Sequence, residues 1–263
     1  MSGELATATD PEVFLSVIIP AYNEEVRLPD SLRQIGEFLR QQAFRSEVVV
    51  VDDGSTDATA RVVEEAGRGP MGPRLVRVAH AGKGHACKAG ILAARGQWLF
   101  LCDSDLSMPI EELARLLPHM NAAHEIVIAS REVDGALRHG EPPYRHVMGR
   151  GFNWLVQTMA VRGIRDTQCG FKAFRAAAAR ELVAVQTIDG WAFDVELLYV
   201  ARKRGYRIRE VGINWYHRGQ SKVRPVKDAV AMFREVLQIQ LNDRRGVYDY
   251  RPMAETRGAD SPR

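Results

Sequence analysis

The feature that most constrains the fold is a regular alternation of two hydrophobic patterns along residues 14–130. Short runs rich in β-branched residues, typical of buried strands, alternate with stretches whose apolar residues recur every three or four positions, typical of helices. A series of strand–helix repeats predicts an α/β fold with a mostly parallel sheet and helices on both faces. The expected strands are 14–20, 47–55, 74–80, 97–105 and 125–130, separated by expected helices at about 24–42, 57–67, 84–95 and 109–122.

The second half of the chain is less regular. We expect a helix at about 144–162, a strand at 171–175, helices at 176–184 and 193–204, a strand at 206–216 and a last amphipathic helix at 225–242. One stripe of that last helix carries Val226, Val230, Phe233, Leu237 and Leu241. We expect one domain over 14–245, with halves 14–130 and 131–245. The ends, 1–13 and 246–263, are small, polar and Pro/Gly-bearing, which predicts disorder.

Composition and charge exclude several classes of protein. The chain is 46% hydrophobic, enough for a sizeable core, and its net charge of +3, without an arginine-rich tract, gives no reason to expect nucleic acid as a partner. Cys87, Cys102 and Cys169 form no CxxC pair, so we expect reduced thiols in a cytoplasmic protein. No signal pattern is present, and no apolar run approaches the roughly 18 residues of a membrane span. We therefore expect a soluble or peripheral chain without a transmembrane segment.

Polar segments follow every strand expected in the first half: "PAYNEE", "DDGSTD", "HAGKGH", "CDSD" and "ASRE". In open parallel sheets, ligands bind beyond the carboxyl ends of the strands. The five segments therefore predict one ligand site at that edge of the sheet.

The segment "CDSD" places Asp103 and Asp105 directly after an apolar strand. Two carboxylates at this spacing can share one hard cation, because Mg²⁺ and Mn²⁺ prefer oxygen ligands. The alternative is a turn, which Asp and Ser start readily. The position beside the other polar strand ends favours a metal site.

Two further segments suit parts of a nucleotide. The "DDGS" segment places Asp52 and Gly54 where a carboxylate could accept hydrogen bonds from a base or ribose, although a plain turn with a helix cap explains it equally well. Lys83 lies between two glycines just before an expected helix, an arrangement that suits a diphosphate or a base carbonyl. No GxGxxG or P-loop pattern is present, so a dinucleotide or P-loop site is not expected.

Four strings, "VIIPAYNEE", "VVVVDDGSTD", "GKGHACKAGI" and "FLCDSD", resemble the family 2 glycosyltransferases of the GT-A fold. Three later strings, "GIRDTQCGFKAF", "GWAFDVELLY" and "INWYHRGQSKV", are similar to the dolichyl-phosphate β-glucosyltransferases and, more distantly, to the polyprenyl-phosphate mannose synthases. The resemblance covers about residues 14–245. It implies a Rossmann-like nucleotide-binding half, an acceptor half and a Mg²⁺ or Mn²⁺ ion on the donor diphosphate.

The resemblance also implies roles for individual residues. Asp103 and Asp105 would hold the metal and, with Arg131 and Asp194, form the catalytic set. The nucleotide sugar would contact Pro20, Ala21, Tyr22, Glu24, Asp52, Gly54, Ser55, Lys83, Gly84, Asp103, Ser104, Arg218, Ser221 and Lys222. The acceptor would contact Arg131, Arg145, Arg150, Asp166, Gln168, Gly170 and Phe171.

The leading hypothesis is an inverting, metal-dependent transfer of glucose from UDP-glucose to a polyprenyl phosphate. A phosphate acceptor is already anionic near pH 7, so it needs charge neutralisation by metal and arginines rather than a general base. One alternative is GDP-mannose or another donor. Another is a soluble hydroxyl acceptor, for which Asp194 would be the base. A catalytically silent sugar-nucleotide binding module is disfavoured, because acceptor-side arginines accompany the donor motifs.

A lipid acceptor would require contact with a membrane surface. Residues 144–159 mix Arg and His with Phe, Trp, Met and Leu, which suits an interfacial amphipathic helix and equally a core helix with a wet edge. In the last helix, basic residues could meet anionic headgroups: Lys227, Arg234, Arg244 and Arg245. The sequence leaves the oligomeric state open, with a homodimer among the alternatives.

Overall fold

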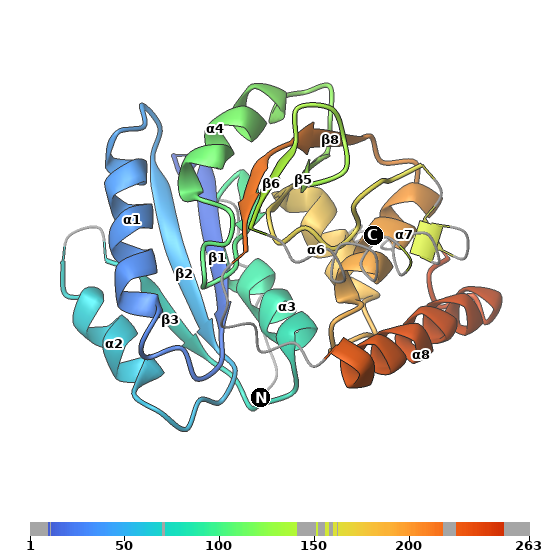
Figure 1. The fold of residues 1–263 in the computed structure, drawn as a ribbon, viewed down its shortest axis with the longest axis horizontal. Helices are drawn as coiled ribbons and strands as arrows, with labels where there is room; N and C mark the ends of the chain where they lie inside the picture. Colours follow the sequence, from blue (N-terminus) through green and yellow to red (C-terminus); the bar gives the residue numbers. More distant parts are fainter. Residues whose placement is uncertain are drawn as a thin grey trace, which may run out of the picture.

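The computed structural model describes residues 10, 12–69, 72–140, 151, 156–157, 160–161, 163–217 and 225–249, with no side-chain description for 225–229. A seven-stranded sheet of order β3-β2-β1-β4-β7-β5-β8 forms its centre (Figure 1). The strands are β1 (Leu15–Ala21), β2 (Ser46–Asp52), β3 (Arg74–Arg77), β4 (Trp98–Leu101), β5 (Ile126–Ser130), β7 (Lys172–Arg175) and β8 (Ile208–Gly212).

The sheet is mostly parallel, as the alternating pattern predicts. β1 pairs in parallel with β2 and β4, β2 with β3, and β5 with β8. The exception is β7, which lies antiparallel between β4 and β5. A small second sheet joins β6 (Leu137–His139) to β9 (Asn214–Tyr216). Because β7 enters the centre of the sheet, the segment before it is brought against the end of β4.

Helices cover both faces of the sheet, and alternate strand residues point to each face. On one face, β-strand residues such as Val17 and Phe100 pack under α1 (Leu28–Arg40), α2 (Thr59–Ala66) and α4 (Leu113–Leu116). On the other, residues such as Ile18 and Leu101 pack under α3 (Lys83–Ala93), α6 (Ala176–Ala184), α7 (Phe193–Lys203) and α8 (Pro225–Arg244). The α/β fold with two covered faces is therefore confirmed.

Some elements differ from the sequence prediction for identifiable reasons. The helix expected at 109–122 is broken into a 3₁₀ turn (Ile110–Glu112), α4 and a second 3₁₀ turn (Leu117–His119). Pro118 lacks the amide that would continue an α-helix. The strand expected at 206–216 splits into β8 and β9 at Ile213, beside a close approach of the 134–136 backbone to Gly212.

Over residues 230–241, the predicted apolar stripe of the last helix does not face the core. Phe233 and Leu237 are among its exposed members, whereas Val236 and Ile239 are fully buried. The packed part of the chain also reaches beyond the domain boundary expected at 245, because Tyr248 is fully buried. The helix expected at 144–162 falls largely outside the described residues.

In the part of the chain that the structure describes, no helix combines the length and the hydropathy that a membrane span needs.

Candidate active site

A pocket of about 510 Å³ opens at the carboxyl ends of the parallel strands. This volume lies within the range typical of small-molecule sites. Segments that follow four strands contribute to it, together with the loop before α7. Its lining consists of Pro20, Ala21, Tyr22, Glu24, Arg27, Asp53, His80, Gly82, Lys83, Ala86, Asp103, Ser104, Asp105, Gly190 and Trp191.

Asp103 and Asp105 reach the pocket because they directly follow β4, a buried strand that lies between β1 and β7 in the sheet. All four residues of β4 are buried, and the Cys102 amide donates to the Ile18 carbonyl at 2.9 Å. The chain then turns sharply, with Leu106 at a φ of 44° and the Ser107 amide donating to Asp105 Oδ1 at 2.9 Å. The turn and the pocket site thus coexist: Asp105 caps the turn and also lines the pocket.

The side of Asp103 away from Lys83 meets Gly170, in the segment before β7. A Cβ atom built on Gly170 would lie 2.0 Å from Asp103 Oδ2. Only glycine therefore fits beside this carboxylate in its present orientation. The resemblance assigned Gly170 to the acceptor, whereas the structure places it behind Asp103.

Lys83 and Asp103 form an ion pair inside the pocket, with 2.6 Å between Lys83 Nζ and Asp103 Oδ1. Burial opposes both charges, but the partners outweigh it: the pKa of Lys83 lies above its ordinary value and the pKa of Asp103 below. Trp191 lies next to this pair, its ring centroid 5.7 Å from Lys83 Nζ. The pocket therefore holds a charged pair against an aromatic wall.

The glycine loop that carries Lys83 is held from two sides. Asp53 accepts hydrogen bonds from the amides of Ala81 and Gly82, both at 3.1 Å. Gly82 has a φ of 127°, and a Cβ atom there would lie 2.5 Å from the Asp189 carbonyl oxygen. Both the backbone conformation and the close approach require glycine at this position.

His80 and Tyr22 stack at the pocket, with ring centroids 4.1 Å apart and an interplanar angle of 17°. His80 Nδ1 also lies 2.8 Å from Asp53 Oδ2. Sequence reasoning missed Asp53, His80 and Trp191. The position of Asp53 and His80 after expected strands was a usable signal, whereas Trp191 reaches the pocket through a distant segment.

The structure places other nucleotide-side candidates around the pocket rather than in its lining. Asp52 Oδ1 accepts from the Ser55 amide at 3.0 Å, and Ser55 Oγ accepts from the Asn23 amide at 2.9 Å. These residues support the two loops after β1 and β2. Gly54, at a φ of 70°, permits the turn, and a Cβ atom at Gly84 would meet the Ile188 carbonyl oxygen at 2.6 Å.

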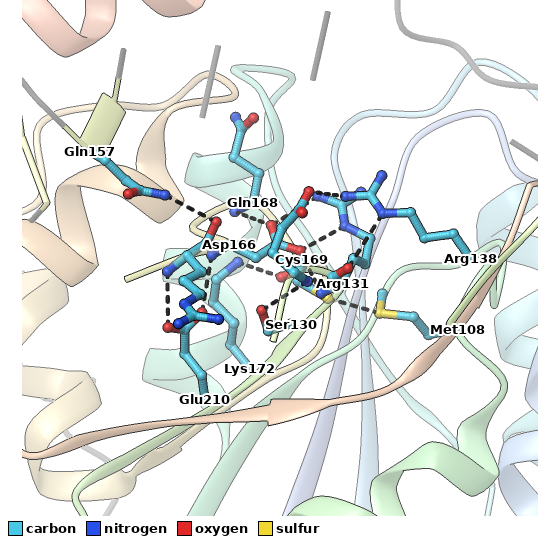
Figure 2. A network of polar contacts seen from close by, with 12 residues as sticks. Met108, Ser130, Arg131, Arg138, Gln157, Asp166, Gln168, Cys169, Lys172 and Glu210 are labelled. Carbon is cyan, nitrogen blue, oxygen red and sulfur yellow. Dashed lines mark hydrogen bonds and ion pairs between the residues drawn. The ribbon is translucent and has the colours of Figure 1, made fainter. Parts of the chain in front are cut away.

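On the acceptor side, Arg131 and Asp166 form a bidentate pair (Figure 2). Arg131 Nε and Nη2 lie 2.7 and 2.9 Å from the Asp166 carboxylate, and the Arg131 amide donates to it at 2.9 Å. Burial opposes the charge on Asp166, but the guanidinium outweighs it and lowers the pKa of Asp166 to about 2. Nearby, Arg138 pairs with Glu132.

Asp194 is not part of the pocket lining, and its carboxylate pairs with Lys172, which sequence reasoning did not single out. Lys172 is 1% exposed; its Nζ lies 2.9 Å from Asp194 Oδ1 and 2.5 Å from the Cys169 carbonyl oxygen. Burial raises the pKa of Asp194, and Lys172 offsets this only in part. Lys172 thus joins the start of α7 to the loop before β7.

The remaining acceptor-side candidates have mainly structural contacts. Phe171 is fully buried, with its ring 4.9 Å from that of Phe100. Gln168 Nε2 lies 3.8 Å from Met232 Sδ on α8. Five further candidates lie outside the described residues: Arg145, Arg150, Arg218, Ser221 and Lys222.

The residues present fit a Mg²⁺ or Mn²⁺ ion bound together with a phosphorylated ligand. Among the described side chains, no group of three or more His, Cys, Asp or Glu could hold a metal. Asp103 and Asp105 nevertheless offer two oxygen donors in one pocket. Mg²⁺ is commonly bound by one or two carboxylates, with substrate phosphates completing its coordination.

Comparison with known proteins defines the class. The family model described as "Glycosyl transferase family 2" matches residues 16–183, which include the strand ends and the loop before β7. The chain belongs to this family and is a glycosyltransferase.

Within this family, the chain is similar to curated proteins that share one name. The chain is 36% identical over 250 residues to a dolichyl-phosphate beta-glucosyltransferase of Dictyostelium discoideum, covering 90% of this chain and 76% of the relative. It is 34% identical over 254 residues to the Homo sapiens protein of the same name, covering 90% and 78%.

Solved structures confirm the GT-A type of fold. Glucosyl-3-phosphoglycerate synthase from Mycobacterium tuberculosis, in complex with Mn²⁺, UDP-glucose and phosphoglyceric acid, aligns with a TM-score of 0.63. The sequences are 20% identical, and the alignment covers 89% of this chain and 80% of that one. At this identity the likeness concerns the fold.

Proposed function

We propose that this glycosyltransferase moves a hexose, with glucose favoured, from a nucleotide sugar, with UDP-glucose favoured, to a dolichyl or other polyprenyl monophosphate. The observation that carries the proposal is the meeting of Asp103, Asp105 and Lys83 in one pocket at the strand ends. Similarity to dolichyl-phosphate beta-glucosyltransferases over about nine-tenths of the chain supports the acceptor class and the sugar.

On the donor side, Asp103 and Asp105 would hold Mg²⁺ or Mn²⁺, which when bound would neutralise charge on the leaving diphosphate. Lys83 adds a positive charge that its surroundings keep fully protonated at neutral pH. The stacked rings of Tyr22 and His80 give the pocket a flat aromatic surface. Such a surface suits the nucleoside, and Trp191 suits the sugar or its diphosphate.

In the reaction, an oxygen of the acceptor phosphate attacks the anomeric carbon as the bond to the diphosphate breaks. The leaving nucleoside diphosphate takes the bonding electron pair, and a single displacement of this kind inverts the anomeric centre. No general base is required, because a phosphate monoester is already ionised near pH 7. This agrees with the engagement of Asp194 by Lys172.

Arg131 is the described cation best suited to orient the acceptor phosphate. Its bidentate pairing with Asp166 fixes the plane of the guanidinium, so the group is ordered before the acceptor arrives. We further propose that the enzyme works peripherally at the cytoplasmic face of a membrane. Three buried free cysteines are compatible with that compartment.

The test is transfer of labelled sugar to a short-chain polyprenyl phosphate with Mg²⁺ or Mn²⁺. UDP-glucose and GDP-mannose are compared as donors, and the matching polyprenol without phosphate is the acceptor control. We expect a glucosyl phosphate lipid with β configuration from UDP-glucose, and no product from the polyprenol or in excess EDTA. Transfer to water-soluble hydroxyl acceptors, with none to the phosphate from any donor, would overturn the proposal.

A further inference from the structure

The outward face of α8 is an exposed apolar stripe at the periphery of the molecule, beside α7 (Figure 1). Four residues at three- and four-residue spacing are exposed by 38 to 48%: Val230, Phe233, Leu237 and Leu241. At about 100° per residue, these side chains share one side of the helix. Exposed apolar patches of this kind mark a protein or membrane interaction surface.

The charges that flank the stripe are positive. Arg234, Arg244 and Arg245 are all exposed. By helical spacing, Arg234 lies beside the stripe and Arg244 lies on the same side as Leu241, three residues further on, while Arg245 directly follows the last residue of α8. Two acidic residues of the helix whose side chains the structure describes are engaged elsewhere: Glu235 accepts from the Ala192 amide at 2.8 Å, and Asp243 lies 2.5 Å from Lys203 Nζ. The outward face therefore combines apolar side chains with positive charge, as interfacial helices on anionic membranes do.

The opposite face of α8 packs against loops at and near the active-site pocket. Glu235 Oε1 lies so near Gly190 that a Cβ atom built on Gly190 would be 2.0 Å from it. Met232 contacts Gln168 in the loop before β7. Asn242 Nδ2 donates to Thr187 Oγ1 at 2.8 Å. A surface bound to the outer side of α8 therefore lies one helix diameter, about 10 Å, from the pocket loops.

We propose that α8 docks flat on an anionic lipid bilayer, with Phe233 and Leu237 at the acyl boundary and the arginines at the headgroups. This rests on the proposed function, because a lipid-linked phosphate is presented at that headgroup level. Docking through α8 would bring the loops that contain Gly190 and Gln168 close to the acceptor at the bilayer surface.

Vesicle co-sedimentation tests the docking without donor, metal or acceptor. The probe is vesicles of phosphatidylcholine with phosphatidylglycerol, and the variant is Phe233→Ser combined with Leu237→Ser. We expect binding to fall about tenfold or more, because two interfacial apolar side chains are lost. Leu137→Ser, at an exposed leucine of β6, should bind as the wild type does. Unchanged binding by the double variant, with an unchanged melting temperature, would overturn the proposal.

A charge variant separates lipid from protein as the occupant. Arg234→Gln with Arg244→Gln should weaken binding about tenfold to anionic vesicles and leave the weaker binding to pure phosphatidylcholine unchanged. If the apolar double variant instead dissociates a dimer and binds vesicles normally, the stripe is a contact between copies of this chain and the proposal is wrong.

Transfer assays keep this proposal separate from the proposed function. Transfer to acceptor embedded in vesicles should fall with vesicle binding in the apolar double variant, and transfer to a water-soluble short-chain acceptor should not. If the wild type binds vesicles but transfers no sugar to either acceptor, the proposed function fails and the docking stands.

Discussion

The two ion pairs of the site region, Lys83–Asp103 and Arg131–Asp166, are built differently. Lys83 and Asp103 meet through a single 2.6 Å contact, and their side chains are 22 and 30% exposed. Asp166 is only 3% exposed and is held by two guanidinium nitrogens and a backbone amide. The first pair is open to the pocket, whereas the second is closed around its carboxylate.

The difference indicates a division of labour. A single contact at a partly exposed position costs less to rearrange than a buried bidentate one, so a diphosphate could replace Asp103 beside Lys83 and a cation could replace Lys83 beside Asp103. A buried bidentate pair is costly to break, so Arg131 keeps its orientation while ligands come and go. Activity should therefore depend most on the open pair and its neighbour Asp105, and stability most on the closed pair.

The largest effect is expected at Asp105. Asp105→Ala should lower the rate of transfer by about 1000-fold or more, equivalent to about 4 kcal/mol of transition-state stabilisation. Because Asp105 is partly exposed and the substitution removes one hydrogen bond of the turn, the melting temperature should fall by only a few degrees. Glu111→Ala, at an exposed carboxylate of the same segment, is the control. Full activity in Asp105→Ala, or in excess EDTA, would contradict the metal assignment.

The substitution Arg131→Met should lower the free energy of unfolding by about 3–5 kcal/mol, because it leaves the buried carboxylate of Asp166 without its charge partner. Urea denaturation measures this change. A double variant, Arg131→Met with Asp166→Leu, should recover much of the loss, since both charges are then absent. If the single variant loses less than about 1 kcal/mol of unfolding free energy, the pair does not stabilise the fold in the way proposed.

Lys83→Met should lower activity more than stability, the reverse of what we expect for Arg131→Met. We expect kcat/KM to fall about 100-fold, because one cation is lost from the leaving diphosphate. The free energy of unfolding should change by less than about 1 kcal/mol, since Asp103 can be solvated. Lys88→Met, on the same helix, is the matched control. A stability loss as large as that of Arg131→Met would remove the distinction between the pairs.

Acid should weaken the closed pair in a defined pH range. Arg131 lowers the pKa of Asp166 from 3.8 to about 2, so the stabilisation is complete above about pH 4 and is lost as the pH falls towards 2. The stabilisation at stake is about 2 kcal/mol. Denaturation of the wild type and Asp166→Asn across this range measures it. The two profiles should converge at low pH, and parallel profiles would contradict the shift.

Much of the fold and part of the site could be predicted from local sequence. The valine-rich β2 and the apolar β4 are buried because a central strand is covered on both faces, and that burial leaves a readable pattern. The same pattern locates the strand ends, and so Asp103, Asp105 and Lys83. Sequence reasoning could not find the partners: Gly170 beside Asp103, or Lys172 beside Asp194, since these contacts join segments far apart in the chain.

The last helix also shows which properties follow from local sequence and which depend on tertiary packing. Its sequence determined that Val230, Phe233, Leu237 and Leu241 share one stripe, because helical periodicity is local. Only the packing decided that the stripe faces outward, because the opposite side, with Glu235 and Ile239, fits the loops around the pocket and α7. The sequence by itself determined the parallel part of the sheet, its strand ends and their chemistry. Tertiary structure decided which charges pair and which apolar face stays exposed, because those outcomes depend on competition among distant segments for the same space.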